Sequence, residues 1–181
     1  MTVVSAALDP AVEVSVTLRD GSELTIRPMH RTDAGRLVRF HHTLSPETTR
    51  LRFFTFHPEL RPDELDRFTH VDHNDREAIV ATVDDEIVGV GRWDRADDAS
   101  LAEVAFVVTD AWQGRGLGSA LLRSLVEQAP QRGIDRFLAV TLTDNRRMLA
   151  VFHRAGKPVT SRFVDGQVEL TMDLRPSRLE S

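Results

Sequence analysis

The chain has 181 residues, which is enough for one domain with a substantial hydrophobic core. Hydrophobic residues make up 41% and charged residues 28%, a composition typical of soluble globular proteins. The absence of cysteine excludes disulfides, a thiolate nucleophile and cysteine-ligated metals. A net charge of −5 disfavours nucleic-acid binding, and no apolar run approaches the roughly 20 residues of a membrane span. We therefore expect a cytoplasmic protein that binds neither nucleic acid nor membrane.

Hydrophobic patterning predicts the order two strands, helices, three strands, helix, strand, helix and two strands. The predicted strands are residues 12–18, 24–27, 77–83, 87–93, 101–108, 136–142, 159–164 and 168–174. Helices are predicted at about 32–43, from Pro46 to a phenylalanine cluster, and at 63–69, 116–129 and 145–155. Thr32 or Asp33 is the predicted N-cap of the first helix, and Pro46 the first residue of the second.

This order predicts a single α/β domain with a mixed sheet over residues 12–175. Residues 1–11 form an N-terminal extension, and residues 176–181 form a C-terminal tail. The extension lacks the basic region of a signal peptide.

A glycine-rich loop, residues 113–118 (Gln-Gly-Arg-Gly-Leu-Gly), lies between the strand 101–108 and the next helix. A helix N-terminus offers unpaired N–H groups, and glycines let phosphate oxygens approach that backbone. A P-loop would need a lysine after Gly118, and the dinucleotide fingerprint would need glycine at Ser119. The spacing alone leaves two readings open, a pyrophosphate cradle and a turn that only joins strand to helix.

The loop resembles the acyl-CoA pyrophosphate motif, Gln/Arg-x-x-Gly-x-Gly/Ala, of the GNAT superfamily of N-acetyltransferases. The order of elements from about Leu24 to Leu174 resembles that superfamily as well. Further segments resemble the acetyltransferase domain of bacterial Pat-type protein lysine acetyltransferases: Ser45–Glu47, Leu51–Phe54, Asp72-His73, Arg76–Ala78 and Ala102–Ala105. The fused regulatory or synthetase-like domain that often accompanies that domain has no counterpart in these residues.

The resemblance implies a GNAT fold, with a mixed, mostly antiparallel sheet and flanking helices. Two parallel strands, 101–108 and 136–142, would splay apart and admit the pantetheine arm of acetyl-CoA. The acyl-CoA-binding residues that it implies are Phe106, Val107, Val108, Gln113, Gly114, Arg115, Gly116, Leu117, Gly118, Ser119, Asn145 and Phe152. Asn145 is equally suited to be a helix N-cap. Phe152 stands where many GNAT enzymes have an acidic tyrosine, and the chain has no tyrosine.

Glu103 is the one charged residue within the apolar strand 101–108. Alternation places Glu103, Ala105 and Val107 on one face, where the small side chains leave room for a ligand. A lysine amine, with a pKa of about 10.4, must lose a proton before it attacks a thioester, and a carboxylate can accept that proton. A strand-end glutamate that points to solvent is the alternative, and the resemblance favours the base.

No metal is expected, since His70, His73 and Asp75 match no fixed zinc pattern. The phenylalanine cluster, Phe53, Phe54 and Phe56, is predicted to lie in the core or to wall the acceptor site.

These observations predict an N-acetyltransferase that moves acetyl from acetyl-CoA to an amine, foremost a protein lysine, by direct attack in a ternary complex. A small-molecule amine is the second candidate acceptor, and a non-catalytic acyl-CoA-binding module is the third reading. The sequence leaves the oligomeric state open, with a homodimer among the options.

Overall fold

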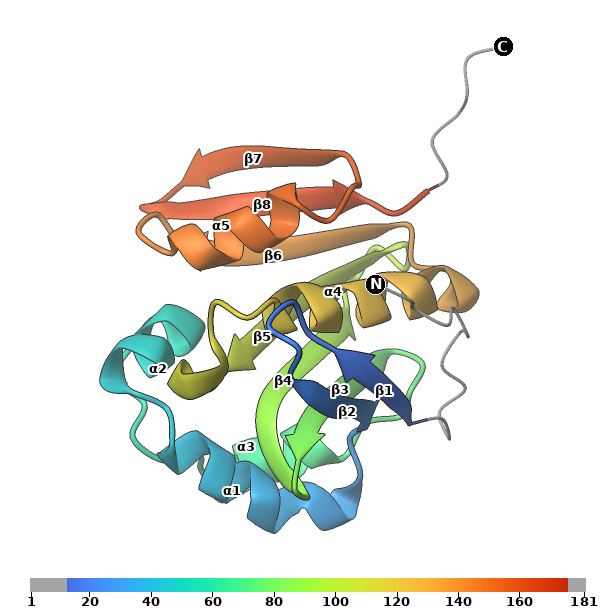
Figure 1. Ribbon diagram of the computed structural model, residues 1–181. Coiled ribbons are helices and arrows are strands. Elements are labelled where there is room, and N and C mark those ends of the chain that lie inside the picture. The colour runs from blue at the N-terminus through green and yellow to red at the C-terminus, as the bar shows by residue number, and fades with distance from the viewer. Residues whose placement is uncertain (1–12, 176–181) are drawn as a thin grey trace.

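The computed structural model describes residues 13–175, which form an eight-stranded sheet with helices on both faces (Figure 1). The strands are β1 (Val14–Thr17), β2 (Glu23–Pro28), β3 (Arg76–Val83), β4 (Glu86–Arg95), β5 (Leu101–Val108), β6 (Arg136–Leu142), β7 (Val159–Val164) and β8 (Gln167–Asp173). The helices are α1 (Ala34–His42), α2 (Pro46–Phe53), α3 (Pro62–Thr69), α4 (Leu117–Gln128) and α5 (Arg146–His153). Short 3-10 helices are η1 (Arg31–Asp33), η2 (Asp110–Trp112) and η3 (Ala129–Arg132). The predicted extension, residue 12 and the tail lie outside the described residues.

The sheet has the strand order β1-β2-β3-β4-β5-β6-β8-β7, and neighbours are antiparallel except β5 and β6. These two parallel strands pair only over Leu101↔Arg136, Ala102↔Phe137 and Glu103↔Leu138. Beyond Glu103, β5 stays paired with β4 and β6 with β8, but not with each other. The predicted mixed α/β fold and its splayed parallel pair are therefore confirmed.

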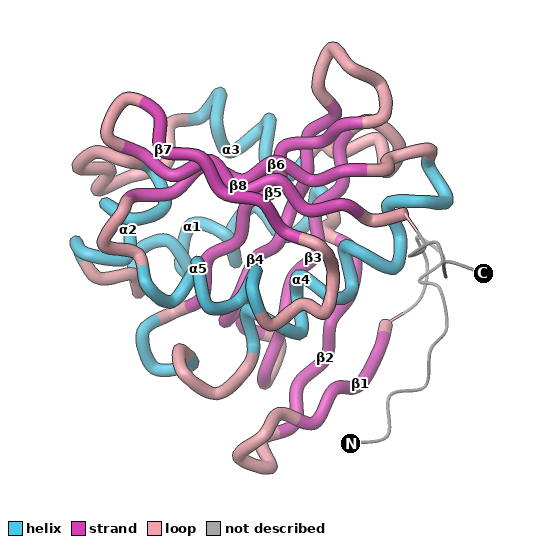
Figure 2. The backbone as a smooth tube through the Cα atoms, turned by 90° about the horizontal axis from the view of Figure 1, so that it is seen from above, coloured by secondary structure: helices cyan, strands magenta, loops and turns pink. Residues whose placement is uncertain are grey.

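Helices lie on both sides of the sheet (Figure 2), and a cluster of buried hydrophobic residues lies beneath each set. One cluster lies under α4 and α5 and includes Leu121, Leu125 and Phe152. The other lies under α1 and α3, where Leu37 and Phe40 pack on β3 and β4. The two faces of the sheet are thus covered by different sets of helices.

The boundaries of most elements match the predicted ones within two residues, because the hydrophobic periods are regular. Ser45 caps α2 by accepting a hydrogen bond from the Thr48 N–H, and Pro46 is the first helical residue, as predicted. Asp33 is the N-cap residue of α1, one of the two predicted alternatives, but its side chain makes no capping hydrogen bond to that helix. Its carboxylate instead accepts hydrogen bonds from the guanidinium of Arg27, at 2.7 and 2.8 Å, and from the backbone N–H of His30.

The phenylalanine cluster is only partly buried, so the predicted core position is wrong for two of its three members. Phe54 is 40% exposed and Phe56 is 74% exposed. α2 ends at Phe54 in the left-handed conformation (φ 63°), which turns the chain away from the core. The side chain of Phe54 lines the cleft described below, whereas Phe53 lines a smaller pocket under α1.

Candidate active site

A cleft with a volume of about 260 Å³ opens where β5 and β6 part. Its walls come from α2, β5, the glycine loop, the start of α4, β6 and α5. The structure brings most of the predicted site residues together in it: Glu103, Phe106, Val107, Val108, Gln113, Gly114, Gly116, Leu117, Gly118, Ser119 and Asn145. Segments that are more than 40 residues apart in the sequence therefore meet around one elongated space.

The backbone of β5 offers hydrogen-bonding groups to this cleft. The Thr109 N–H bonds to the Val88 carbonyl, and the Ala96 N–H bonds to the Leu101 carbonyl. The backbone N–H and C=O groups of the odd-numbered residues of β5 therefore point toward β4. The peptide groups of Phe106 and Val108 must then point the other way, toward the parted β6. An extended ligand in the cleft can pair with the N–H groups of both residues and with the Phe106 carbonyl, as a strand would, while the Val108 carbonyl accepts a hydrogen bond from Gln113. The peptide groups of Val107 point toward β4, so its side chain alone can meet such a ligand.

The glycine loop has the geometry of an anion cradle. Gly114 (φ 76°) and Gly116 (φ 98°) adopt left-handed conformations that favour glycine. Gly116 is the N-cap of α4 and provides no side-chain cap, so side chains leave the first N–H groups of this helix free. A Cβ at Gly118 would lie 3.5 Å from the side chains of Phe106 and Val151, on the side where a ligand would pass. This loop fits a pyrophosphate better than it fits a simple turn.

Four arginines that the sequence analysis did not place in the site line the same cleft. Arg52 lies near Glu103 and is described below, and the other three are Arg19, Arg147 and Arg154. Arg19 comes from the β1–β2 turn, and its side chain lies beside Gly116. Arg147 and Arg154 share a face of α5 with Val151, at spacings of four and three residues. The helical spacing of Arg147 and Arg154 was a signal in the sequence that could have placed them together, whereas no local signal pointed to Arg19. Together they place positive charge where the phosphates of CoA would lie.

Gln113 holds the loop in place. Its Nε2 donates to the Val108 carbonyl (3.0 Å) and to Thr48 Oγ1 (3.1 Å), and its Oε1 accepts a hydrogen bond from Arg147. One side chain thus joins α2, β5 and α5 at the mouth of the cleft. Gln113 therefore positions the glycine loop, in addition to any contact that it makes with a ligand.

Two of the predicted cofactor-binding side chains point elsewhere. Arg115 lies 4.9 Å over the ring of Trp112 and forms an ion pair with Asp20, so its charge faces the β1–β2 turn. Phe152 is fully buried and stacks on Phe106 with ring centroids 6.2 Å apart. It supports the floor of the cleft without lining it. The prediction that these residues contact the cofactor stays untested.

Asn145 has one of its two predicted roles, the N-cap, and its bond to the pantetheine arm stays a prediction. Its Oδ1 accepts a hydrogen bond from the Met148 N–H and caps α5, and the residue also lines the cleft. Thr141 on β6 is the other polar group of this wall, and it is 1% exposed. Its Oγ1 has no hydrogen-bond partner among residues 13–175. An unpaired buried hydroxyl in the cleft fits a ligand that carries amide groups, such as the pantetheine arm.

Glu103 lies at the point where the two parallel strands part, since it is the last residue of β5 that pairs with β6. Its side chain is exposed and lines the cleft, together with Ala105 and Val107 on the same strand face. Arg52 of α2 lines the cleft as well, and its charge interacts with that of Glu103. A carboxylate in this position can accept a proton from an amine that reaches the cleft end.

The histidines near residue 70 are occupied by local contacts. His73 Nδ1 lies 2.8 Å from Glu77 Oε1, and His70 Nδ1 lies 2.8 Å from Asp66 Oδ1. Within the described part of the chain, no group of three or more potential ligands could hold a metal ion. None of its helices is long and apolar enough to cross a membrane.

A cleft between splayed parallel strands, with a glycine-rich helix N-terminus at one end and a carboxylate at the other, defines the class of CoA-dependent N-acyltransferases. Comparison with known proteins gives the family. Residues 39–156 match the model of the acetyltransferase (GNAT) family, and the chain belongs to that family. The predicted GNAT fold and acetyltransferase class are thereby confirmed.

Relatives with known structure or curated sequence agree. The GNAT domain of S. lividans PAT is 42% identical, with a TM-score of 0.84 over 89% of this chain and 96% of that domain. An acetyltransferase from Pseudomonas aeruginosa, PA5475, is 33% identical over 73% of both chains. Acetyltransferase Pat from Mycolicibacterium smegmatis is 34% identical over 79% of this chain and 44% of its own length.

Proposed function

We propose that the protein transfers the acetyl group of acetyl-CoA to the side-chain amine of a protein lysine, with Glu103 as the general base. The GNAT family and the two Pat-type relatives support the acceptor class. The observation that carries the proposal is the position of Glu103 at the end of the cleft, where β5 and β6 part.

The acceptor side supports a lysine rather than a bulky metabolite. Behind Ala105 and Val107, the pocket under α1 measures only about 30 Å³. That volume holds about two water-sized groups, so a bulky metabolite such as an antibiotic does not fit there. A lysine side chain is unbranched and can reach the cleft end while its own protein stays outside.

The reaction would proceed in one ternary complex, because the chain has no cysteine to carry an acyl group. Glu103 takes a proton from the amine, directly or through one water, and the amine attacks the thioester carbonyl. A backbone N–H of Phe106 or Val108, both directed toward the cleft, stabilises the oxyanion. The chain has no tyrosine, so the CoA thiolate takes its proton from water or from another group.

The test is the release of CoA thiol from acetyl-CoA in the presence of lysine peptides, with small amines for comparison. Glu103→Gln should lower kcat/KM for the peptide by about 100-fold or more, because general base catalysis contributes about 10² to 10⁴ in rate. Glu127→Gln on α4 removes the same charge outside the cleft and should leave the rate unchanged. Turnover of Glu103→Gln within a few-fold of wild type would contradict the assignment.

A further inference from the structure

Arg92 is a buried arginine with a spare donor. It lies on β4, its side chain is 7% exposed, and its Nε donates to Asp94 Oδ2 at 3.2 Å. The guanidinium lies 4.6 Å from the ring centroid of Phe68. Its Nη2 has no hydrogen-bond partner within residues 13–175. An unpaired donor on a buried cation is costly, and such a group usually has a partner in the functional complex.

Arg52 brings a second guanidinium to the same place. It comes from α2, lies 5.0 Å from the ring centroid of Phe53, and forms no hydrogen bond or ion pair with any described residue. Burial, reinforced by the charge of Arg92, lowers the pKa of Arg52 to about 10. The nearby carboxylates offset only part of the charge of this pair. Asp94 is shared between Arg92 and Arg67, and Glu103 interacts with the charge of Arg52 but forms no ion pair with it within residues 13–175.

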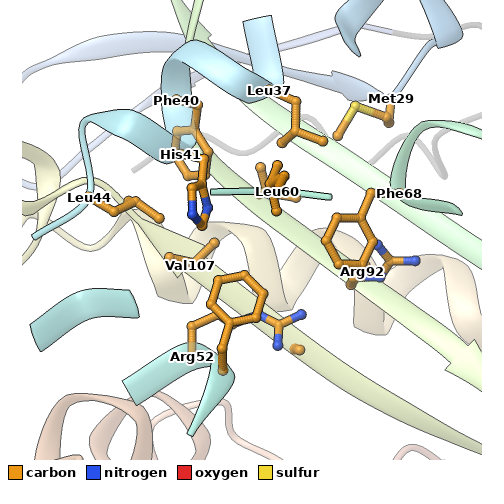
Figure 3. A pocket seen from close by; sticks show the side chains of 13 residues that line it. Met29, Leu37, Phe40, His41, Leu44, Arg52, Leu60, Phe68, Arg92 and Val107 are labelled. Atoms are coloured by element: carbon orange, nitrogen blue, oxygen red, sulfur yellow. The ribbon is translucent and has the colours of Figure 1, made fainter. Parts of the chain in front are cut away.

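Both arginines line the small pocket under α1 (Figure 3). Its other walls are apolar for the most part and include Met29, Leu37, Phe40, Leu44, Leu60 and Phe68. Ala105, Val107 and Arg52 line both this pocket and the main cleft, so the pocket adjoins the end of the cleft near Glu103. The pocket has room for about two water-sized groups, which matches the two oxygens of a carboxylate.

We propose that Arg52 and Arg92 form a subsite for a carboxylate carried by one of the two substrates of the transfer. Guanidinium groups match carboxylates in shape and charge, and an apolar surrounding strengthens the attraction. The anion would supply the missing partner of Arg92 Nη2 and separate two like charges. The inference rests on the acyl transfer of the proposed function, because the subsite selects substrates only beside a reacting thioester. It replaces either the acetyl group or the protein lysine of that proposal with a substrate that carries a carboxylate.

The carboxylate has two chemical sources. It can be the terminal carboxylate of a dicarboxylic acyl group on CoA, or the carboxylate of an acceptor amino acid. An acetyl group and a polypeptide lysine side chain both lack it. The subsite therefore predicts a higher rate in one of two comparisons. Either succinyl-CoA reacts faster than acetyl-CoA, or free lysine reacts faster than the diamine that lacks its carboxylate.

The experiment compares CoA thiol release in two arms with the complete chain. The first arm gives one lysine peptide with acetyl-CoA or succinyl-CoA. The second arm gives acetyl-CoA with free lysine or with cadaverine, which differ only in the α-carboxylate. We expect kcat/KM to be at least tenfold higher for the carboxylate-bearing member of one arm. That preference should fall to about unity in Arg52→Met and in Arg92→Met.

Arg67→Met is the matched control, since Arg67 contacts the same Asp94 but its side chain is 61% exposed and lies outside the pocket. It should retain the preference. Arg52 lies on a short surface helix, so Arg52→Met decides the question even if Arg92→Met does not fold.

The absence of a preference in both arms would overturn the inference, as would a preference that survives Arg52→Met. If lysine peptides are acetylated without any carboxylate preference, only the subsite is wrong. If a carboxylate preference appears with small amines but no lysine peptide reacts, the subsite stands and the proposed acceptor is wrong.

Discussion

Removal of the unpaired hydroxyl of Thr141 is predicted to raise the stability of the free protein and to weaken ligand binding. Thr141→Val keeps the shape of the side chain and removes the hydroxyl. In the free protein, an unsatisfied buried polar group costs about 1 to 3 kcal/mol, and we take the lower end because the cleft reaches solvent. The variant should therefore be more stable by about 1 kcal/mol, which raises Tm by about 2–4 °C in a chain of this size.

The same change should weaken ligand binding. If Thr141 Oγ1 bonds an amide of the pantetheine arm, its loss removes about 0.5 to 1.5 kcal/mol of binding free energy. The Kd for CoA should then rise about 2- to 12-fold. Thermal unfolding with and without CoA, together with titration calorimetry, measures both effects on one preparation.

Thr69→Val is the control. Thr69 is 3% exposed and lies on α3 away from the cleft, and its hydroxyl already donates to the Leu65 carbonyl at 2.9 Å. This variant should lose stability and keep its CoA affinity. If Thr141→Val is destabilised in the same way while CoA affinity is unchanged, the hydroxyl is not a ligand group and the reasoning is refuted.

Two further predictions concern the glycine loop and the ion pair between Arg27 and Asp33. Gly116→Ala should lose about 1–2 kcal/mol of stability, because an L-residue at φ 98° is strained. Gly118→Ala, in helical conformation, should gain up to about 1 kcal/mol, yet weaken CoA binding by placing a methyl group in the cleft; urea unfolding and calorimetry measure the two effects. Asp33→Asn should lose roughly 3 kcal/mol at pH 7, because Arg27 would lose its buried partner. Burial would raise the pKa of Asp33, but hydrogen bonds from Arg27 and His30 outweigh it and lower the pKa. Its contribution is therefore fully present above about pH 4 and is lost as pH falls through the lowered pKa.

The outcomes that would contradict these predictions are specific. For the loop, equal stability changes in the two glycine variants would mean that φ does not decide them. For Asp33, urea unfolding of wild type and Asp33→Asn from pH 7 to pH 3 should show a free-energy gap that narrows below pH 4. A gap that stays constant would show that the carboxylate charge is not its source.

The sequence predicted the sheet and the position of the glycine loop and of Glu103 in the cleft, because each depends on a local pattern or on a short motif. It did not predict Arg52 and Arg92 as neighbours, since they are 40 residues apart on α2 and β4 and only the packing of α1 and α2 unites them. Asp33 is the N-cap of α1 as predicted, but its side chain makes no capping hydrogen bond to that helix, for a similar reason. A buried arginine six residues earlier competes for the carboxylate, and propensity rules contain no such partner.

The exposed phenylalanines show a different limit. Hydrophobicity predicted burial for Phe54 and Phe56, but a left-handed residue at the end of α2 redirects the chain. Phenylalanine is not a residue that normally marks such a turn. The direction of the chain after α2 depends on the left-handed backbone conformation of Phe54, which the residue type did not predict.

The three residue pairs between β5 and β6 have a consequence for the cooperativity of the domain. They are the only direct strand pairing between β1–β5 and the C-terminal unit β6–β8–β7 within the described residues. A ligand that bonds to β5 on one side and packs against β6 on the other would extend that junction along the cleft. Amide hydrogen exchange in β6 and β8 would then report on occupancy of the cleft.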